Sequence, residues 1–547
     1  MPSAEGLENE RHEGSFRAGW AAPFGVVALA ALVRFHDLDG LGIWVDEANT
    51  ILIAGQSLPV LLDKLRLDSS PPLFYVVLHF WMRVLGDAGW ALRLFSALAG
   101  VGLVAAIGWA GRELISRRVG LWAALFAAVS PIQAFYSQQV RMYALLPLLA
   151  LLSVAFLVRY LGGGMRRHYA LWVAFTILAL YTHNFAIYLL PMDGVLIALS
   201  GRLVRGFGRW ALAGALISLA YAPWIPFLLE QLGNRDHYAW FVPYWEGAGL
   251  SGIVVRSFLS YSPGQEYMLA AGMGKLETWG GWPTLGVAAL AAFGAWRQAL
   301  RWRRCGLADA LWPSAYLLVP IGCALIVSSW LTPHYVPGRV DQMMFPAFAL
   351  LVGAGIAGLR STPLRVVVVA AIVAVAGWSR PNPPDEHRPL TIPIGGVRQK
   401  FLPQGSDREL AARVVDRWRP GDVILCTSLT RASLEYYLRR AGVEAGLLSF
   451  PRDTAEHLGA QNDARWLADR PALAREAAEV MAQARVLAGA RGRIIVVRVQ
   501  SRINGSLEDA SLERRFGYEQ VEHLGHFMQI GTGALIEVAI YLSLPGR

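Results

Sequence analysis

Long apolar runs recur along the first 380 residues, and each is separated from the next by a polar loop. A helix that spans a bilayer needs about 20 mostly apolar residues at 1.5 Å rise each. Eleven segments fit this pattern, and they predict a polytopic α-helical membrane protein: Gly19–Phe35, Trp90–Ala110, Gly120–Tyr136, Met142–Tyr160, Tyr169–Thr182, Phe185–Ser200, Trp210–Leu229, Gly281–Trp296, Leu311–Trp330, Met343–Leu359 and Leu364–Trp378.

Arginine is concentrated in every second loop. The positive-inside rule places such loops in the cytoplasm, so we expect a multi-pass protein of the cytoplasmic (inner) membrane. The N-terminus is then inside and, with eleven spans, the C-terminal part is outside. These loops also explain the net charge of +10, which therefore does not indicate nucleic-acid binding. The basic residues are Arg112, Arg117, Arg118, Arg166, Arg167, Arg202, Arg205, Arg209, Arg297, Arg301, Arg303, Arg304, Arg360 and Arg365.

The composition changes near Ser379. We predict a membrane domain over residues 1–380, a proline-rich linker over 381–395 and a soluble α/β domain over 396–547. In that last domain the pattern predicts helices at 408–419, 432–440 and 471–488, and strands at 422–427, 493–500 and 534–544. It contains no G-x-G-x-x-G after a strand, so we predict no nucleotide site. The whole chain is 55% hydrophobic and 16% charged, where soluble domains have about 25% charged residues.

The first loop, residues 36–89, is predicted to lie outside and to hold two helices. Val60–Leu67 mixes apolar and charged positions, as a helix at the membrane interface does. Leu73–Leu85 follows Pro71-Pro72, and proline is favoured in a first helical turn because it lacks the N–H that would be unpaired there.

Three acids in this loop are candidate catalytic residues: Asp46, Glu47 and Asp68. Carboxylates are costly near hydrocarbon, so their place beside the first apolar segment suggests a function. Transfer to an alcohol or amine needs a base near the proton of the acceptor. The alternatives stay open: a solvated pair, Asp46 as a helix N-cap, or Asp68 as a turn residue.

Four cations of the predicted outer side could bind a phosphate: Arg141, Arg339, Lys64 and Arg93. Each could equally contact lipid headgroups or extend its charge to the interface. His183 and His334 also belong to outer loops and could hold a divalent cation with Glu47 or Asp68. No pair of histidines has metal-ligand spacing on one helix, which favours headgroup or aromatic contacts, and we assign no certain cofactor.

Several motifs together resemble the glycosyltransferase superfamily C, in particular bacterial relatives of protein O-mannosyltransferases and of the lipid A aminoarabinose transferase. They are WVDEA at Trp44–Ala48, SPPLFY at Ser70–Tyr75, LHFWMRVLGDAGWALRLFSALAG at Leu78–Gly100, SPIQAFYSQQVRMYAL at Ser130–Leu145, YTHNFAIYLLP at Tyr181–Pro191, and Gly338-Arg339 before a span. Their order along the spans makes the resemblance specific.

The resemblance implies an inverting transferase with a polyprenyl-phosphate sugar as donor. It implies Asp46 as the base, Glu47 as its neighbour and Asp68 as an approximate match to a second acid. Relatives often have His-Pro-Pro-Leu where this chain has Ser70 and Arg-Tyr where it has Arg339-Val340. The first departure puts in doubt any contact that such a histidine makes, and the second leaves the arginine in place.

Three hypotheses follow from the sequence. The first is transfer of one sugar to a lipid, glycan or protein acceptor on the outer face of the membrane. The second is a transporter or flippase of lipid-linked sugars, although charged residues inside the spans are few. The third makes the outer domain an adaptor on an inactive membrane part. The identity of the sugar and of the acceptor does not follow from the sequence.

Overall fold

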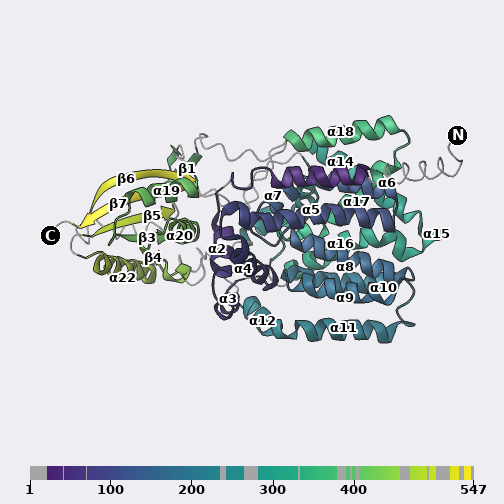
Figure 1. The fold of residues 1–547 in the computed structure, drawn as a ribbon, viewed down its shortest axis with the longest axis horizontal. Helices are drawn as coiled ribbons and strands as arrows, with labels where there is room; N and C mark the ends of the chain where they lie inside the picture. The colour runs from purple at the N-terminus through teal and green to yellow at the C-terminus, as the bar shows by residue number, and fades with distance from the viewer. Residues whose placement is uncertain are drawn as a thin grey trace, which may run out of the picture.

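The computed structural model describes residues 21–40, 42–68, 70–233, 242–263, 281–330, 333–378, 390–394, 397–401, 406–455, 468–489, 492–499, 518–528 and 535–543. Two parts are joined in one elongated molecule (Figure 1). One is a bundle of helices that lie side by side along the long axis. The other contains a β-sheet, and the short helices α2, α3 and α4 of the first loop lie between the two.

Helices occupy all eleven predicted apolar segments within the described residues. By length and composition, four described helices could cross a membrane, or five if one bent pair counts as a single span. The bundle helices are Ala21–Phe35, α5 (Gly89–Leu114), α6 (Arg117–Val129), α7 (Pro131–Ser137), α8 (Leu145–Leu161), α9 (Arg166–Leu180), α10 (Leu189–Leu199), α11 (Phe207–Tyr221), α12 (Ile225–Gly233), α13 (Val242–Ser260), α14 (Gly281–Ala299), α15 (Trp302–Cys305), α16 (Leu307–Trp330), α17 (Phe345–Gly358) and α18 (Thr362–Trp378).

One predicted span is broken. α6 and α7 meet at an angle of 64°, where the sequence pattern indicates one continuous helix. Pro131 lacks the N–H that would bond to the carbonyl of Ala127. The fully buried guanidinium of Arg34 replaces that donor, with hydrogen bonds of 3.0 Å to Ala127 O and 3.1 Å to Ala128 O. An arginine inside the bundle thus satisfies the carbonyls that the break exposes.

The first loop contains one helix more than predicted. α3 (Leu58–Lys64) and α4 (Leu73–Leu85) agree with the two predicted helices. The additional helix, α2, covers Val45–Ala54 and includes the two adjacent acids. Its N-cap is Trp44, whose backbone N–H donates to Glu47 at 3.4 Å, so the N-cap role considered for Asp46 is wrong.

The sheet of the C-terminal part has the strand order β4-β3-β5-β7-β6. β3, β4 and β5 are parallel, whereas β7 pairs antiparallel with both β5 and β6. Strands β4 and β6 were not predicted. A separate two-stranded hairpin, β1 with β2, begins inside the segment predicted as linker. The strands are β1 (Leu390–Ile394), β2 (Val397–Phe401), β3 (Val423–Thr427), β4 (Gly446–Phe450), β5 (Arg493–Val499), β6 (Tyr518–Met528) and β7 (Leu535–Ser543).

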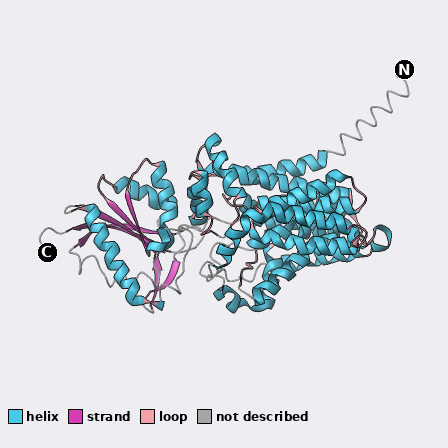
Figure 2. Cartoon of the chain, turned by 90° about the horizontal axis from the view of Figure 1, so that it is seen from below, coloured by secondary structure: helices cyan, strands magenta, loops and turns pink. Residues whose placement is uncertain are grey.

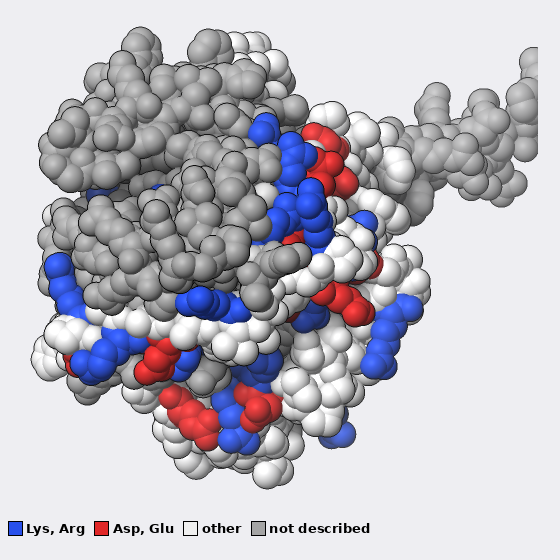
Figure 3. All heavy atoms as spheres, turned by 90° about the vertical axis from the view of Figure 1, so that its left-hand side faces the viewer, with Lys and Arg blue, Asp and Glu red and all other residues white. Residues whose placement is uncertain are grey.

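Helices cover both faces of the five-stranded sheet (Figure 2). α22 (Arg470–Ala488) packs on one face, and α19 (Asp407–Arg417) and α20 (Arg431–Arg440) pack on the other. On the side of this part that looks away from the bundle, basic and acidic side chains are interspersed over the described surface (Figure 3). α20 also contacts α2, so the sheet-containing part reaches the helix that carries the acids.

Candidate active site

An ion pair joins two of the predicted residues across the chain. Arg339, just before the 3-10 helix Val340–Met344, donates to the Asp46 carboxylate at 2.5 Å, and its Nε donates to the hydroxyl of Tyr143 at 2.8 Å. The two charged side chains are 19% and 18% exposed. The pair therefore lies at the edge of the packed bundle, where a ligand can reach it. Gly338 has a φ of 80°, a value that glycine adopts without strain, and the turn at this residue places Arg339 beside Asp46.

Arg141 lies beside this pair and is almost fully buried. It donates to the Thr50 hydroxyl at 2.7 Å, and its Nε has no hydrogen-bond partner among the described residues. Burial acts to lower the pKa of Arg141, but the surrounding tyrosines Tyr75 and Tyr143 and the nearby carboxylates outweigh it and raise that pKa. The guanidinium thus stays charged, with hydrogen-bonding capacity left over.

Asp68 belongs to the same neighbourhood. Its carboxylate is buried and accepts a hydrogen bond of 2.5 Å from the Tyr75 hydroxyl. Asp68 is also one of the carboxylates that raise the pKa of Arg141. Asp68 thus contacts α4 through Tyr75, and its charge acts on the guanidinium of Arg141.

Glu47 and Arg93 form a different pair. Glu47 accepts from Arg93 at 2.9 and 2.7 Å and from the backbone N–H of Val140 at 2.8 Å. Arg93 also donates to the carbonyls of Leu38 and Gly42, at 3.0 and 2.9 Å. Both side chains are buried. This pair ties the start of α2 to α5, so neither charge faces the edge of the bundle as those of Asp46 and Arg339 do.

The remaining predicted residues are His183, His334 and Lys64. His183 packs its ring 6.1 Å from that of Tyr143, and its Nδ1 accepts from the N–H of Phe185. Burial, with the charges of Arg141 and Arg339, lowers its pKa to about 3, so this imidazole is neutral.

His334 bonds to the Tyr188 hydroxyl at 2.6 Å and to Ser328 at 3.1 Å. Lys64 ends α3, half-buried. In the described part of the chain, no three His, Cys, Asp or Glu side chains are grouped as metal ligands.

Sequence reasoning missed Tyr143, Thr50 and Tyr75. Each is buried and bonds to a charged residue of the site: Tyr143 to Arg339, Thr50 to Arg141 and Tyr75 to Asp68. A single hydroxyl within an apolar run gives no periodic signal, so nothing in the sequence pattern singles out these three.

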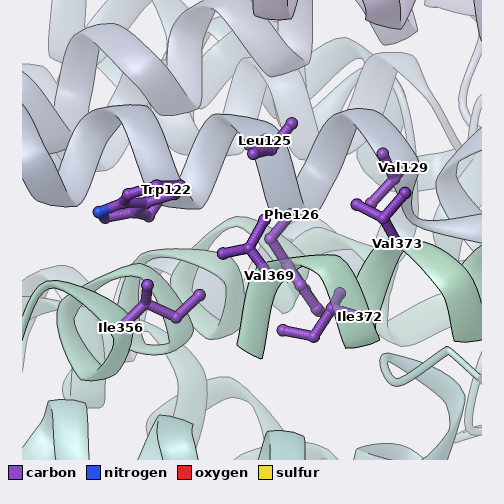
Figure 4. A pocket seen from close by; sticks show the side chains of 8 residues that line it. All are labelled: Trp122, Leu125, Phe126, Val129, Ile356, Val369, Ile372 and Val373. Carbon is purple, nitrogen blue, oxygen red and sulfur yellow. The ribbon is translucent and has the colours of Figure 1, made fainter. Parts of the chain in front are cut away.

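A small apolar crevice lies between α6, α17 and α18 (Figure 4). Trp122, Phe126, Ile356 and Val369 are among its lining residues, and it offers hardly any polar surface. It therefore contains no group that could act as a base or bind a phosphate, and the polar cluster around Asp46 remains the candidate site.

Comparison with known proteins bears on the fold. Residues 69–227 match the family model of dolichyl-phosphate-mannose-protein mannosyltransferases. No curated protein sequence matches the chain. Among solved structures, ArnT from Cupriavidus metallidurans bound to undecaprenyl phosphate is 13% identical with a TM-score of 0.55, and the match covers 95% of this chain and 98% of ArnT.

A second similar structure is the archaeal oligosaccharyltransferase AglB from Archaeoglobus fulgidus, in complex with an inhibitory peptide and a dolichol-phosphate. It is 10% identical with a TM-score of 0.51, and the match covers 87% of this chain and 69% of AglB. The resemblance to the glycosyltransferase superfamily C is therefore confirmed over residues 69–227, and the chain has the fold that ArnT and AglB share.

Proposed function

We propose that this protein is an inverting glycosyltransferase. It moves one sugar from a polyprenyl-phosphate donor to a lipid, glycan or protein acceptor at the outer face of the cytoplasmic membrane. The observation that carries the proposal is the contact between Asp46 and Arg339, with Arg141 beside it. A base and two phosphate-binding cations are thus at the edge of a helical bundle. The polyprenyl and dolichyl phosphates bound by ArnT and AglB support the donor class.

In the proposed reaction, Asp46 takes the proton of the acceptor hydroxyl or amine. The acceptor atom attacks the anomeric carbon while the bond from that carbon to the phosphate oxygen breaks. The polyprenyl phosphate leaves with the bonding electrons, and the configuration of the sugar inverts. Arg339 and Arg141 stabilise the negative charge that grows on the phosphate.

Because Arg339 is bonded to Asp46 in this structure, it has to exchange that carboxylate for the phosphate when the donor binds. Release from Arg339 leaves the Asp46 carboxylate oxygen free to accept the proton of the acceptor. Donor binding therefore activates the base, and we expect the donor to bind before the acceptor reacts.

The other predicted residues have supporting roles in this proposal. Asp68 is one of the carboxylates near the Arg141 guanidinium, while Glu47 and Arg93 hold α2 in place. Lys64 stays a candidate for contact with the lipid headgroup. His183 is neutral and is better suited to pack beside Tyr143 than to bind an anion.

The finer topology is part of the same proposal. We propose eleven spans, the N-terminus inside and both the first loop and residues 396–547 outside. The arginine-rich loops support this orientation. The first loop then lies where α3 and α4 can rest on the membrane surface, since their exposed side chains include Leu62, Phe80 and Val84.

The test is transfer by purified Asp46→Asn. The variant removes the proton acceptor but keeps the size and most hydrogen bonds of the side chain. We expect loss of transfer, measured by mass spectrometry of envelope acceptors, with a normal melting temperature. Binding of polyprenyl phosphate should be no weaker than in the wild type, because the competing charge on Arg339 is gone. Normal turnover by this variant would exclude Asp46 as the base. Flux of lipid-linked sugar in proteoliposomes, without any glycosidic bond formed, would favour a transporter instead.

A further inference from the structure

Helix α20 of the sheet-containing part packs against helix α2. Ala432 and Tyr436 of α20 are buried, and they belong to the same apolar cluster as Ala48 and Ile51 of α2. The helix that carries Asp46 is therefore covered from one side by a segment almost 400 residues later in the sequence.

The contact includes a hydrogen bond at the entry to α2. The backbone N–H of Ile43 donates to the hydroxyl of Tyr437 at 2.7 Å, and Ile43 is buried. Ile43 directly precedes the N-cap Trp44 and is three residues from Asp46. A donor buried at this place has to be satisfied, and the backbone around it is fixed when it is.

The opposite side of the same segment is held by the bundle. Arg93 of α5 donates to the carbonyls of Leu38 and Gly42, at 3.0 and 2.9 Å. Farther out, Arg408 of α19 donates to the carbonyl of Asp39 at 2.7 Å. Residues 38–40, 42 and 43 thus lie between the two parts of the molecule, and both parts fix the backbone that leads into α2.

From this arrangement we propose that Tyr437 is a positioning residue for the transfer reaction: it holds the start of α2 so that the Asp46 carboxylate keeps its place beside Arg339. The inference rests on the proposed function of Asp46. It also gives the sheet-containing part a specific task, because its α20 completes the support of the catalytic helix and does not act as an adaptor alone.

The neighbouring Tyr436 is a matched control. It has the same side chain on the same helix, and its hydroxyl also bonds to a loop carbonyl of the bundle part, that of Asp87 at 3.0 Å. Asp87 lies between α4 and α5, so this contact does not touch the entry to α2. Arg440 donates to the same carbonyl, which keeps that contact in part when the Tyr436 hydroxyl is removed.

The experiment compares the full-length protein with Tyr437→Phe and Tyr436→Phe, each in lipid nanodiscs. Hydrogen exchange of the peptide covering residues 43–50 and steady-state kinetics are measured. For Tyr437→Phe we expect at least about fivefold faster exchange there, because the hydrogen bond to Ile43 is lost together with the one between Tyr437 and Arg408. We also expect a kcat lowered by between about fivefold and a hundredfold, the range that a small misplacement of a catalytic group produces. The donor KM stays unchanged, because Arg141 and Arg339 are not altered.

Wild-type exchange in Tyr437→Phe, or an equal loss of kcat in Tyr436→Phe, would overturn the proposal. If the wild type transfers no sugar, the proposed function fails, and the exchange data alone still decide whether Tyr437 orders α2. If Tyr437→Phe does not fold, 3-fluorotyrosine at position 437 is used, since it keeps the ring and weakens the hydroxyl as an acceptor. A smaller change in the same direction is then expected, and no change overturns the proposal.

Discussion

Replacing Glu47 by Gln should mainly reduce the stability of the protein, whereas replacing Asp46 by Asn should mainly abolish its activity. Glu47→Gln leaves the guanidinium of Arg93 buried without its counter-charge, because the side chains of this pair are 0% and 4% exposed. Breaking a buried ion pair by removing one partner costs about 3–5 kcal/mol. Asp46→Asn breaks a pair that is nearly a fifth exposed, where the cost is smaller because water screens the remaining charge.

The double variant Glu47→Gln with Arg93→Met separates the charge effect from the packing effect, because the amide oxygen of the new Gln still accepts from the backbone N–H of Val140. Removing both charges of a buried pair is often close to neutral. Here the carbonyls of Leu38 and Gly42 lose their donor as well, so we expect a residual cost of about 1–3 kcal/mol. The double variant should therefore be more stable than Glu47→Gln alone.

The assay is the unfolding of purified variants in detergent, followed by tryptophan fluorescence and by size-exclusion chromatography after heating, with transfer activity measured on the same samples. We expect Glu47→Gln to lower the melting temperature clearly and to lose activity in proportion to the folded fraction. Asp46→Asn should melt like the wild type and have no activity. The reasoning is refuted if Glu47→Gln is as stable as Asp46→Asn, or if the double variant is the least stable of the three.

Three further predictions follow from the same structure. The pKa of His183 in the folded protein is about 3, below its ordinary value of about 6.5. Between these two pH values the unfolded chain binds more protons than the folded protein. The free energy of unfolding should therefore fall as the pH drops, by up to about 1.4 kcal/mol per pH unit. His183→Gln should flatten this dependence of the melting temperature on pH, and an unchanged slope would contradict it. Cys305 is the last residue of α15 and follows Arg303 and Arg304, so its loop is predicted to be cytoplasmic. An impermeant maleimide should therefore label Cys305 in inverted vesicles but not in intact cells. Cys426 should stay unlabelled in both, because it is fully buried and burial raises the pKa of its thiol to about 12. Arg339→Lys keeps the charge but loses the planar fork, and we expect about tenfold weaker binding of polyprenyl phosphate, measured by displacement of a labelled analogue.

Much of the fold could be predicted because its signals are local. Apolar runs marked the bundle helices, and Pro71-Pro72 marked the start of α4 at its observed residue. The break between α6 and α7 could not be predicted in the same way. Proline is tolerated inside membrane helices, as Pro313 and Pro320 within α16 show. The break at Pro131 depends on Arg34, which lies almost 100 residues earlier and supplies the replacement donor.

The C-terminal part shows the same limit. Strands β3, β5 and β7 were predicted because their central residues form continuous buried apolar runs or alternate regularly. β4 lies at one edge of the sheet and its sequence GLLSF is short, with its first residue exposed. β6 lies at the other edge, and its pairing with β7 has two register shifts that interrupt a regular alternation. Edge strands are specified mainly by the neighbour that they pair with, and the sequence of one strand does not contain that neighbour.

For the site, the sequence singled out the acids but could not separate their roles. The roles could not be separated because helix α2 was not predicted. On a helix, successive residues point about 100° apart, whereas residues four apart share a face. Asp46 and Thr50 therefore share the face that meets Arg339 and Arg141, and Glu47 turns away from it toward the bundle. In an irregular loop the relative directions of adjacent side chains are not fixed, which is why the sequence left two candidates side by side. Because α2 is a helix, Asp46 is the candidate for the chemistry, and Glu47 supports the helix.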